Sequence, residues 1–160
     1  MIPAYQTINT SIKDNIYGNC ASACIASILE CDINEVPNVN DYLHKKGIKS
    51  YEEFKKTSLY MYWLYQELVP YLNSKGYNFC FTDDEKSFVQ DGYCTLNFLI
   101  KVSEDGNFFT AQHSVVGFGT KMVFDPSIRE KEFINLYMQV LFLTVEETSK
   151  LDHNWTIFGK

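Results

Sequence analysis

The sequence contains no run of about 20 consecutive apolar residues, the length that a helix needs to cross a bilayer. Its N-terminal stretch lacks a basic segment followed by an apolar core, so we expect no signal peptide. It also lacks internal repeats, low-complexity tracts and linkers rich in proline or serine. Since 160 residues is about the usual length of one domain, we predict a single domain over residues 1–160.

An excess of positive charge is also absent. The net charge of −6 is spread along the chain, which argues against nucleic acid or an anionic membrane surface as a partner. The five cysteines are an odd number without a secretory signal, and this favours reduced thiols over a disulfide scaffold. We therefore expect a cytoplasmic protein.

The chain has 46% hydrophobic and 21% charged residues, a composition typical of a globular protein with a sizeable core. Aromatic residues make up 16% of the chain, with 12 Phe and 11 Tyr. This share predicts an aromatic core and a groove lined by tyrosines.

The clearest helical pattern begins at a cysteine. Asn19 is a favourable N-cap residue, and apolar residues recur at helical spacing after it, so a helix is predicted from about Cys20 to Glu30. A second short turn is expected over residues 33–36, stopped by Pro37.

A longer helix is predicted further along the chain. Ser50 and Ser58 are two more N-cap candidates, and residues 59–76 read as a helix with a bend or break at Pro70 and an end at Gly76. Its aromatic residues are most simply helix core, with the alternative that some of them line a substrate groove, namely Tyr62 or Trp63.

The second half of the chain changes to β-rich patterns. Turn signals at residues 104–107 and 119–121 join three of these segments into hairpins. Helical residues 1–76 followed by sheet residues 77–160 predict an α+β fold with helices packed on an antiparallel sheet. The predicted strands are residues 77–82, 92–103, 108–118, 122–125 and 137–145.

Cys20 stands where a thiol is most easily ionised. The first turn of a helix has unbonded N–H groups and the positive end of the helix dipole, which favour the thiolate over the thiol. The same N–H groups can stabilise an oxyanion when the thiolate attacks a carbonyl. Such a nucleophile needs a general base, and the base needs a group that orients it.

Two residues on neighbouring predicted strands fit these roles. His113 and Asp125 are separated by one short hairpin turn, and neighbouring strands lie about 5 Å apart, so their side chains can hydrogen-bond. His113 would take the thiol proton and Asp125 would hold the imidazole tautomer. The other histidines, His44 and His153, lie in polar surroundings without a comparable acid.

Three short stretches in this order carry a resemblance. GNCASACIASIL followed by EVPNV, then HSVVGF and then VFDPS together resemble the papain-like cysteine peptidase superfamily, closest to small bacterial and phage proteins similar to C39-type peptidases. The resemblance implies a papain-like fold with Cys20 as nucleophile, His113 as base and Asp125 as orienting acid. It implies no cofactor and no metal.

The resemblance also implies a glutamine before the nucleophile whose amide helps to form the oxyanion hole. Gln6 is the only glutamine before Cys20, and Asn15 or Asn19 could supply the amide instead. Tyr17 and Gly18 are predicted to bind substrate, because Gly18 leaves room for a substrate to approach.

Other interpretations of the same residues stay open. Cys20 could be a packed thiol, His113 an ordinary strand histidine and Asp125 a turn former before Pro126. Cys24, one turn after Cys20, is expected to be core. A metal site built on these two cysteines and His113 does not have the spacing of a structural zinc site. The remaining cysteines are expected to be core or half-buried: Cys31, Cys80 and Cys94.

The function expected is hydrolysis of a peptide, isopeptide or other amide through a thioester, with a peptide, protein or other amide-containing molecule as the substrate. Water as the acceptor would make a peptidase or amidase, and an amine would make an acyltransferase. The alternative is a catalytically inert papain-like protein that captures a host protein or a small molecule. The sequence leaves the oligomeric state open.

Overall fold

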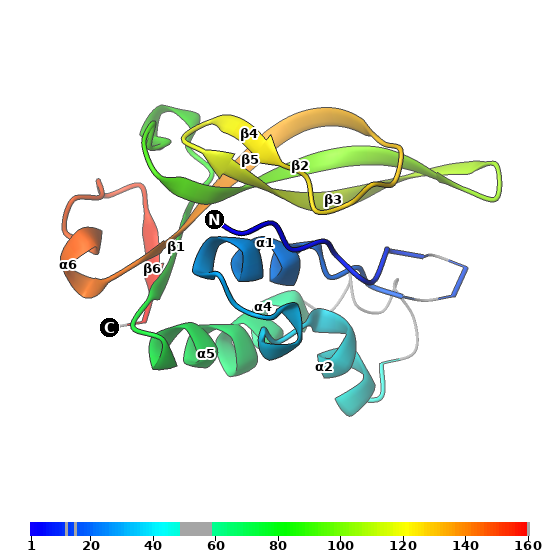
Figure 1. The fold of residues 1–160 in the computed structure, drawn as a ribbon, viewed down its shortest axis with the longest axis horizontal. Coiled ribbons are helices and arrows are strands. Elements are labelled where there is room, and N and C mark those ends of the chain that lie inside the picture. The colour runs from blue at the N-terminus through cyan, green and yellow to red at the C-terminus, as the bar shows by residue number, and fades with distance from the viewer. Residues whose placement is uncertain (12, 15, 49–58, 160) are drawn as a thin grey trace.

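The computed structural model describes residues 1–11, 13–14, 16–48 and 59–159, which form an α+β fold in which helices pack against an antiparallel sheet (Figure 1). The predicted α+β class and antiparallel sheet are confirmed. None of the helices in the described ranges is long and apolar enough to cross a membrane. Ser50 and Ser58, two of the predicted N-caps, lie outside the described residues.

The helical layer comes mainly from the first half of the chain. The predicted first helix is confirmed as α1, and the turn after Cys31 as the 3-10 helix η1. Glu30 ends α1 in a left-handed conformation with φ of 57°. The helices of this layer are α1 (Cys20–Leu29), η1 (Ile33–Glu35), α2 (Val39–Lys45), α4 (Leu59–Trp63), η2 (Leu64–Leu68) and α5 (Val69–Ser74).

Residues 59–74 are continuously helical, with a distortion before the proline. The turn η2 is a π-helix, and Pro70 is among the first residues of α5 that follow it. Proline has no N–H for the helical ladder, so the chain accommodates it beside a widened turn. Gly76, with φ of 88°, follows the end of the helix as predicted.

The sheet has six strands in the order β4-β3-β2-β5-β1-β6, and every neighbouring pair is antiparallel. β2, β3 and β5 are 12 residues long and form its centre. The strands are β1 (Asn78–Thr82), β2 (Tyr93–Glu104), β3 (Asn107–Phe118), β4 (Lys121–Phe124), β5 (Glu132–Leu143) and β6 (Thr156–Phe158), and the short helix η3 (Glu85–Ser87) lies between β1 and β2.

Both predicted hairpins are present. Asp105 and Gly106 join β2 to β3, and both have positive φ, as a tight two-residue hairpin turn requires. β3 and β4 pair from Phe118–Lys121 to Val116–Phe124, where β4 ends. The edge of β3 beyond Val116 therefore has no β4 partner, and this edge faces α1.

The last predicted strand begins and ends earlier than expected, because β5 covers Glu132–Leu143 and not residues 137–145. Thr144 terminates β5 and caps the helix α6 (Val145–Thr148) through a reciprocal capping box with Glu147. In the capping box the backbone N–H groups of Thr144 and Glu147 are hydrogen-bonded by each other's side chains. They therefore need no partner on a neighbouring strand, and the chain turns into a helix at Thr144. The small edge strand β6, which was not predicted, pairs with β1.

Apolar side chains fill both faces of the sheet. The larger cluster lies between the helices and β1 and β5, and includes Trp63, Leu72 and Phe79. A second cluster around Leu96 and Trp155 covers the opposite face.

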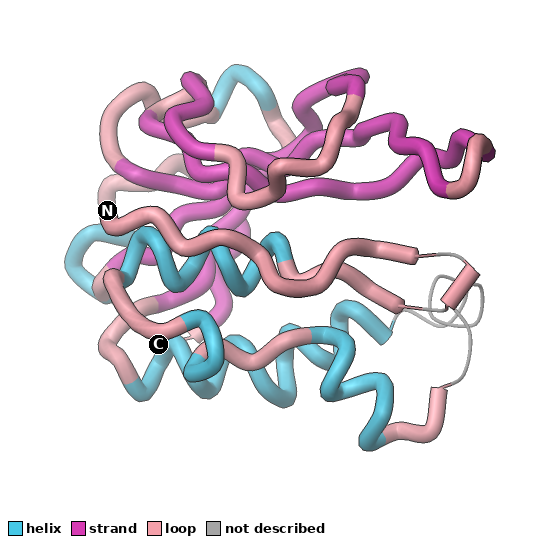
Figure 2. Tube along the Cα trace, turned by 45° about the vertical axis from the view of Figure 1, so that its right-hand side comes forward, coloured by secondary structure: helices cyan, strands magenta, loops and turns pink. Residues whose placement is uncertain are grey.

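The N-terminal segment runs as a loop between the strands and the helices (Figure 2). The N–H of Ile2 donates to the Ser27 carbonyl of α1, and the N–H of Gln6 donates to the Pro126 carbonyl beyond β4. The segment therefore ties the start of the chain to the last turn of α1 and to the loop that follows β4.

Candidate active site

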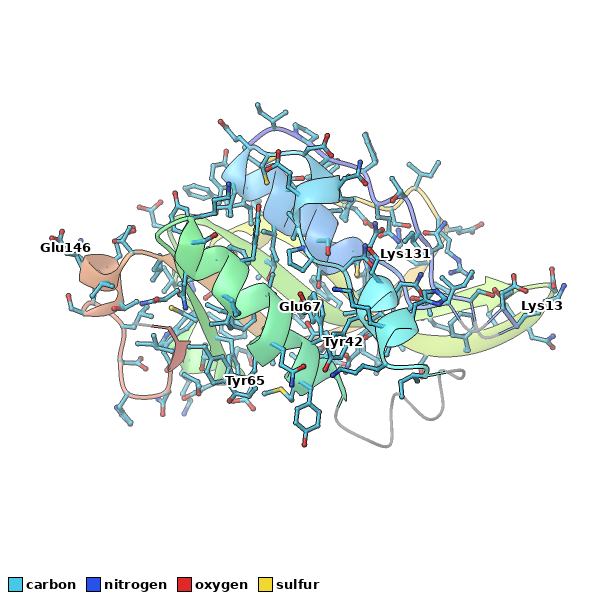
Figure 3. The ribbon with its side chains drawn as sticks, turned by 90° about the horizontal axis from the view of Figure 1, so that it is seen from below. Lys13, Tyr42, Tyr65, Glu67, Lys131 and Glu146 are labelled. Carbon is cyan, nitrogen blue, oxygen red and sulfur yellow. The ribbon has the colours of Figure 1, made fainter. Side chains whose placement is uncertain are left out.

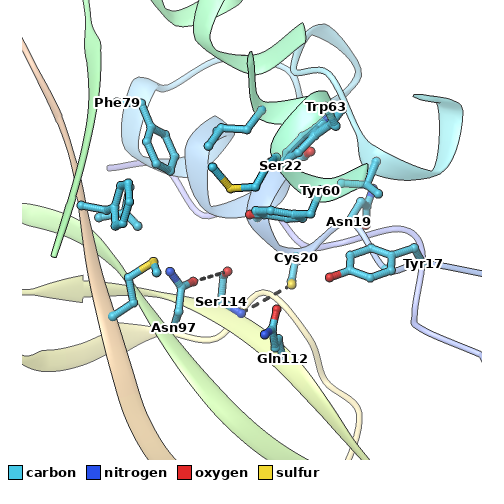
Figure 4. Close-up of a pocket in the computed structure, with 18 of the residues that line it drawn as sticks. Tyr17, Asn19, Cys20, Ser22, Tyr60, Trp63, Phe79, Asn97, Gln112 and Ser114 are labelled. Carbon is cyan, nitrogen blue, oxygen red and sulfur yellow. Dashed lines mark hydrogen bonds between the residues drawn. The ribbon is translucent and has the colours of Figure 1, made fainter. Parts of the chain in front are cut away.

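Cys20 is the first residue of α1 and lies against the open edge of β3 (Figure 4). The Ser114 N–H donates to Cys20 Sγ over 3.4 Å, and the thiol is partly exposed. β4 ends before it reaches Ser114, so the Ser114 N–H is not taken up by a strand partner on that side and can donate to Cys20. A backbone N–H directed at the sulfur favours the thiolate.

His113 and Asp125 meet as predicted. His113 lies on β3, is 5% exposed, and its Nε2 is 2.7 Å from Asp125 Oδ1, just after the end of β4. The same Asp125 oxygen accepts from the Ser127 N–H at 2.9 Å. The hydrogen bond with Asp125 at Nε2 leaves the other ring nitrogen, Nδ1, for Cys20.

The three groups shift one another's protonation. Desolvation alone would raise the pKa of Cys20, but its hydrogen bond and charge interaction with His113, together with the Ser114 contact, lower it. Burial opposes the charged imidazole, yet the hydrogen bonds to Asp125 and Cys20 raise the pKa of His113 from 6.5 to about 9. Both shifts favour a thiolate–imidazolium pair.

The Asp125 carboxyl is ionised at neutral pH, because its pKa is lowered. Burial alone would raise its pKa, and the donors His113, Lys131 and Ser127 lower it from 3.8 to about 2. A permanently charged carboxylate fixes the imidazole tautomer and stabilises the imidazolium.

Lys131 is a part of the site that the sequence reasoning missed. Its Nζ lies 2.7 Å from Asp125 Oδ2 and 3.0 Å from the Ser127 carbonyl, with the side chain only 6% exposed. Figure 3 shows Lys131 nearer the middle of the molecule, whereas Lys13 lies at the exposed tip of the β2–β3 hairpin. Spacing gives no signal for Lys131, because the contact depends on how the chain returns after Pro126.

The predicted oxyanion residues have other partners. Gln6 lies beside the site, but its Nε2 donates to the Ile8 carbonyl at 3.0 Å and to Asn9 Oδ1 at 2.9 Å. It lines a small pocket of about 20 Å³ together with Cys20 and His113. Asn15, the alternative, lies outside the described residues.

Asn19 occupies the N-cap position of α1 as predicted, but its side chain makes no capping hydrogen bond there. Its Oδ1 accepts instead from the N–H groups of Thr7 and Ile8, at 3.1 and 3.0 Å, and its Nδ2 donates to Thr7 Oγ1 at 2.9 Å. These three bonds draw the side chain away from the helix. The first-turn N–H groups beside Cys20 are therefore left without an Asn19 cap.

Gln112 is an amide that the sequence reasoning did not select. It lines the pockets on both sides of Cys20, and Figure 4 draws it next to the sulfur. Within the described residues no hydrogen bond engages its side chain. Its position one residue before His113 is the only sequence signal that could have pointed to it.

Tyr17 and Gly18 line a larger pocket of about 220 Å³ that opens at Cys20. A Cβ at Gly18 would lie 2.9 Å from Thr10 Oγ1 and 3.2 Å from the Ile8 carbonyl. The close approach of this N-terminal segment therefore requires glycine. Trp63 also lines this pocket, as the alternative prediction for the aromatic helix proposed.

The other cysteines and histidines lie apart from this chemistry. Cys24 is fully buried, and burial raises its pKa well above the ordinary value. Burial also raises the pKa values of Cys80 and Cys94 to about 11. The described part of the chain holds no group of three or more His, Cys, Asp or Glu side chains that could bind a metal. His44 and His153 are exposed.

Comparison of the chain with protein-family models, with curated proteins and with solved structures found no match. The interpretation of the site therefore rests on its geometry.

Proposed function

We propose that this chain is a papain-like thiol hydrolase that cleaves an amide bond through a thioester on Cys20. The observation that carries the proposal is the meeting of Cys20, His113 and Asp125 from α1, β3 and the end of β4. The lowered pKa of Cys20 supports the role of nucleophile, and the raised pKa of His113 supports proton transfer.

The reaction starts from the thiolate–imidazolium pair. The Cys20 thiolate attacks the carbonyl carbon, and the electron pair of the C=O bond moves to oxygen. When the C–N bond breaks, the His113 imidazolium gives its proton to the leaving amine, and a thioester remains. Neutral His113 then takes a proton from water as the water attacks the thioester, and the Cys20 thiolate leaves. An amine in place of water would make the same chain an acyltransferase.

The oxyanion has candidate donors on two elements. The first N–H groups of the ten-residue helix α1 lie at the positive end of its dipole and lack a side-chain cap. The Gln112 amide lies next to Cys20 from β3. We assign the side-chain role to Gln112 before Gln6, because both N–H groups of the Gln6 amide already have acceptors.

Trapping of the acyl-enzyme tests the proposal. With 4-nitrophenyl acetate we expect a burst of nitrophenolate and one acetyl group on the peptide that contains Cys20, located by mass spectrometry. Cys20→Ala abolishes the burst, and the matched variant Cys24→Ala, one turn further along the same helix, retains it. An acetyl group on other cysteines, or a burst that survives Cys20→Ala, would contradict the proposal.

A second candidate function is ligand capture without turnover, which the size and apolar lining of the pocket beside Cys20 favour. In that case Cys20→Ser retains ligand affinity and no wild-type product accumulates. Release of a carboxylic acid by wild type, lost in Cys20→Ser, decides for the hydrolase.

A further inference from the structure

Cys20 lies between two pockets of different character. The larger one, of about 220 Å³, lies between the helices and the sheet, with aromatic and aliphatic side chains as most of its lining. The smaller one, of about 20 Å³, is lined by polar and basic side chains such as Gln6, Arg129 and Lys131. Figure 4 shows the larger pocket extending from the sulfur towards Phe79 and Trp63.

Apart from Cys20 itself, no charged side chain is among the described residues that line the larger pocket. Two phenols of its lining, Tyr60 and Tyr137, have pKa values raised by burial, so they are neutral at physiological pH. A carboxylate or ammonium group that entered would lose its water without gaining an opposite charge, which is costly. An uncharged apolar group would lose only unfavourable hydration.

The position of His113 decides which part of a substrate enters each pocket. Successive side chains of a strand point to opposite faces, and Ser114 lines the larger pocket while His113 lines the smaller one. The imidazolium must reach the leaving group to protonate it. The leaving group therefore lies on the His113 side of Cys20, and the acyl group extends to the other side.

We propose that the larger pocket binds the acyl group of the substrate and selects an uncharged, apolar acyl group, aliphatic or aromatic. This inference rests on the proposed function, because an acyl group is defined by the thioester on Cys20. Met61, which is 38% exposed, lines the pocket and offers a position where its charge can be changed.

A series of 4-nitrophenyl esters measures this selectivity with one leaving group. The second-order rate constant for acylation of Cys20, divided by that for alkaline hydrolysis, rises from acetyl through butanoyl to hexanoyl, by about fourfold for each methylene buried. The glutaryl monoester, which has a terminal carboxylate, reacts at least about tenfold more slowly than the pentanoyl ester. Equal normalised rates across the series would overturn the inference.

A charge placed at the pocket tests the location. In Met61→Lys the disadvantage of the glutaryl ester decreases by about threefold, because the ammonium gives the carboxylate a partner. Met122→Lys is the matched control, since Met122 is an exposed methionine of β4 outside the pocket, and it leaves the ratio unchanged. A similar change in both variants would place the selectivity elsewhere.

Binding to Cys20→Ala separates the two proposals, because it needs no thioester. Trp63 lines the pocket, so its fluorescence reports occupancy by pentanamide and by glutaramate, its charged counterpart. Pentanamide binding at least about tenfold tighter than glutaramate, without any acylation of wild type, would retain the pocket and reject the hydrolase. Acylation of Cys20 with no preference in either assay would retain the hydrolase and reject the pocket.

Discussion

At the residue scale, the reactivity of Cys20 is a balance between burial and partners. Burial raises the pKa of Cys24 on the same helix well above its ordinary value, with no partner to oppose it. Desolvation also acts to raise the pKa of Cys20, yet the net shift is downward because His113 and the Ser114 N–H stabilise the thiolate. The difference between the two thiols therefore comes from their neighbours on β3.

Asp125 makes the fold sensitive to acid. Its pKa is lowered from 3.8 to about 2 in the folded chain, so its stabilising contribution is present above pH 3.8 and is lost as the pH falls through about 2. We expect this loss to be roughly 2 kcal/mol of the free energy of unfolding. Asp125→Asn lacks this part of the pH dependence, as measured by urea unfolding from pH 5 to 2. The exposed control Asp91→Asn retains this pH dependence of the free energy of unfolding. If Asp125→Asn showed the same pH dependence as wild type, this account of Asp125 would be refuted.

Lys131 acts on the site through Asp125. Lys131→Met leaves Asp125 Oδ2 without its buried donor, so the pKa of Asp125 rises, and the free energy of unfolding at pH 7 falls by about 2 kcal/mol. Lys121→Met, at an exposed position of β4, changes it by less than about 0.5 kcal/mol.

The titration of the Asp125 carboxyl, followed by NMR, distinguishes this positioning role from simple packing. Lys131→Arg restores a low midpoint in part, because a cation returns, whereas Lys131→Met does not. An unchanged midpoint in Lys131→Met would show that the lysine only fills space.

At the scale of elements, the site depends on a short strand and a short segment. β4 has four residues, so the β3 edge at Ser114 is left open to the start of α1. The start of α1 is held there by Asn19, whose side chain bonds to Thr7 and Ile8. A longer β4 would cover the edge that the thiol now contacts.

Removal of the Asn19 side chain is expected to loosen this attachment. Asn19→Ala leaves the N–H groups of Thr7 and Ile8 without their acceptor, which costs about 1–3 kcal/mol of stability in chemical denaturation. Asn19→Asp keeps a carboxylate oxygen as acceptor and stays within about 1 kcal/mol of wild type. Equal losses in both variants would contradict the role assigned to Oδ1.

A larger side chain at Gly18 is a second test of the packing between the start of α1 and the N-terminal segment. A Cβ in Gly18→Ala would meet both Thr10 and the Ile8 carbonyl, so we expect a loss of about 1–3 kcal/mol in thermal or urea unfolding. Adding Thr10→Ala removes the side-chain contact but not the backbone contacts, and restores only part of the stability. Full tolerance of Gly18→Ala would show that the segment can move away.

At the scale of the whole molecule, periodicity and turn chemistry predicted most of the fold. The helix at Cys20 and the hairpin turn at Asp105 and Gly106 follow from local residue preferences, and both are present. The capping box of Thr144 and Glu147 is also a local sequence pattern. It was missed because the apolar run of β5 continues to Val145 and was assigned to the strand. β6 is only three residues long and is defined by its partner β1, so no local pattern reveals it.

The candidate site also contains some residues that the sequence predicts and others that it does not. Cys20, His113 and Asp125 are residue types whose chemistry is recognisable from order and context. Lys131 belongs to the site only through the path of the chain in three dimensions, and the only sequence signal for Gln112 is its position next to His113. The pocket is likewise a property of the packing between helices and sheet.

The rate at which Cys20 is alkylated by iodoacetamide as a function of pH tests the central claim most directly. The site predicts a wild-type midpoint below that of a free cysteine thiol measured in the same buffer. In His113→Ala the midpoint lies above that value, because burial remains after the imidazole is gone. A wild-type midpoint at or above that of free cysteine, unchanged in His113→Ala, would contradict the account.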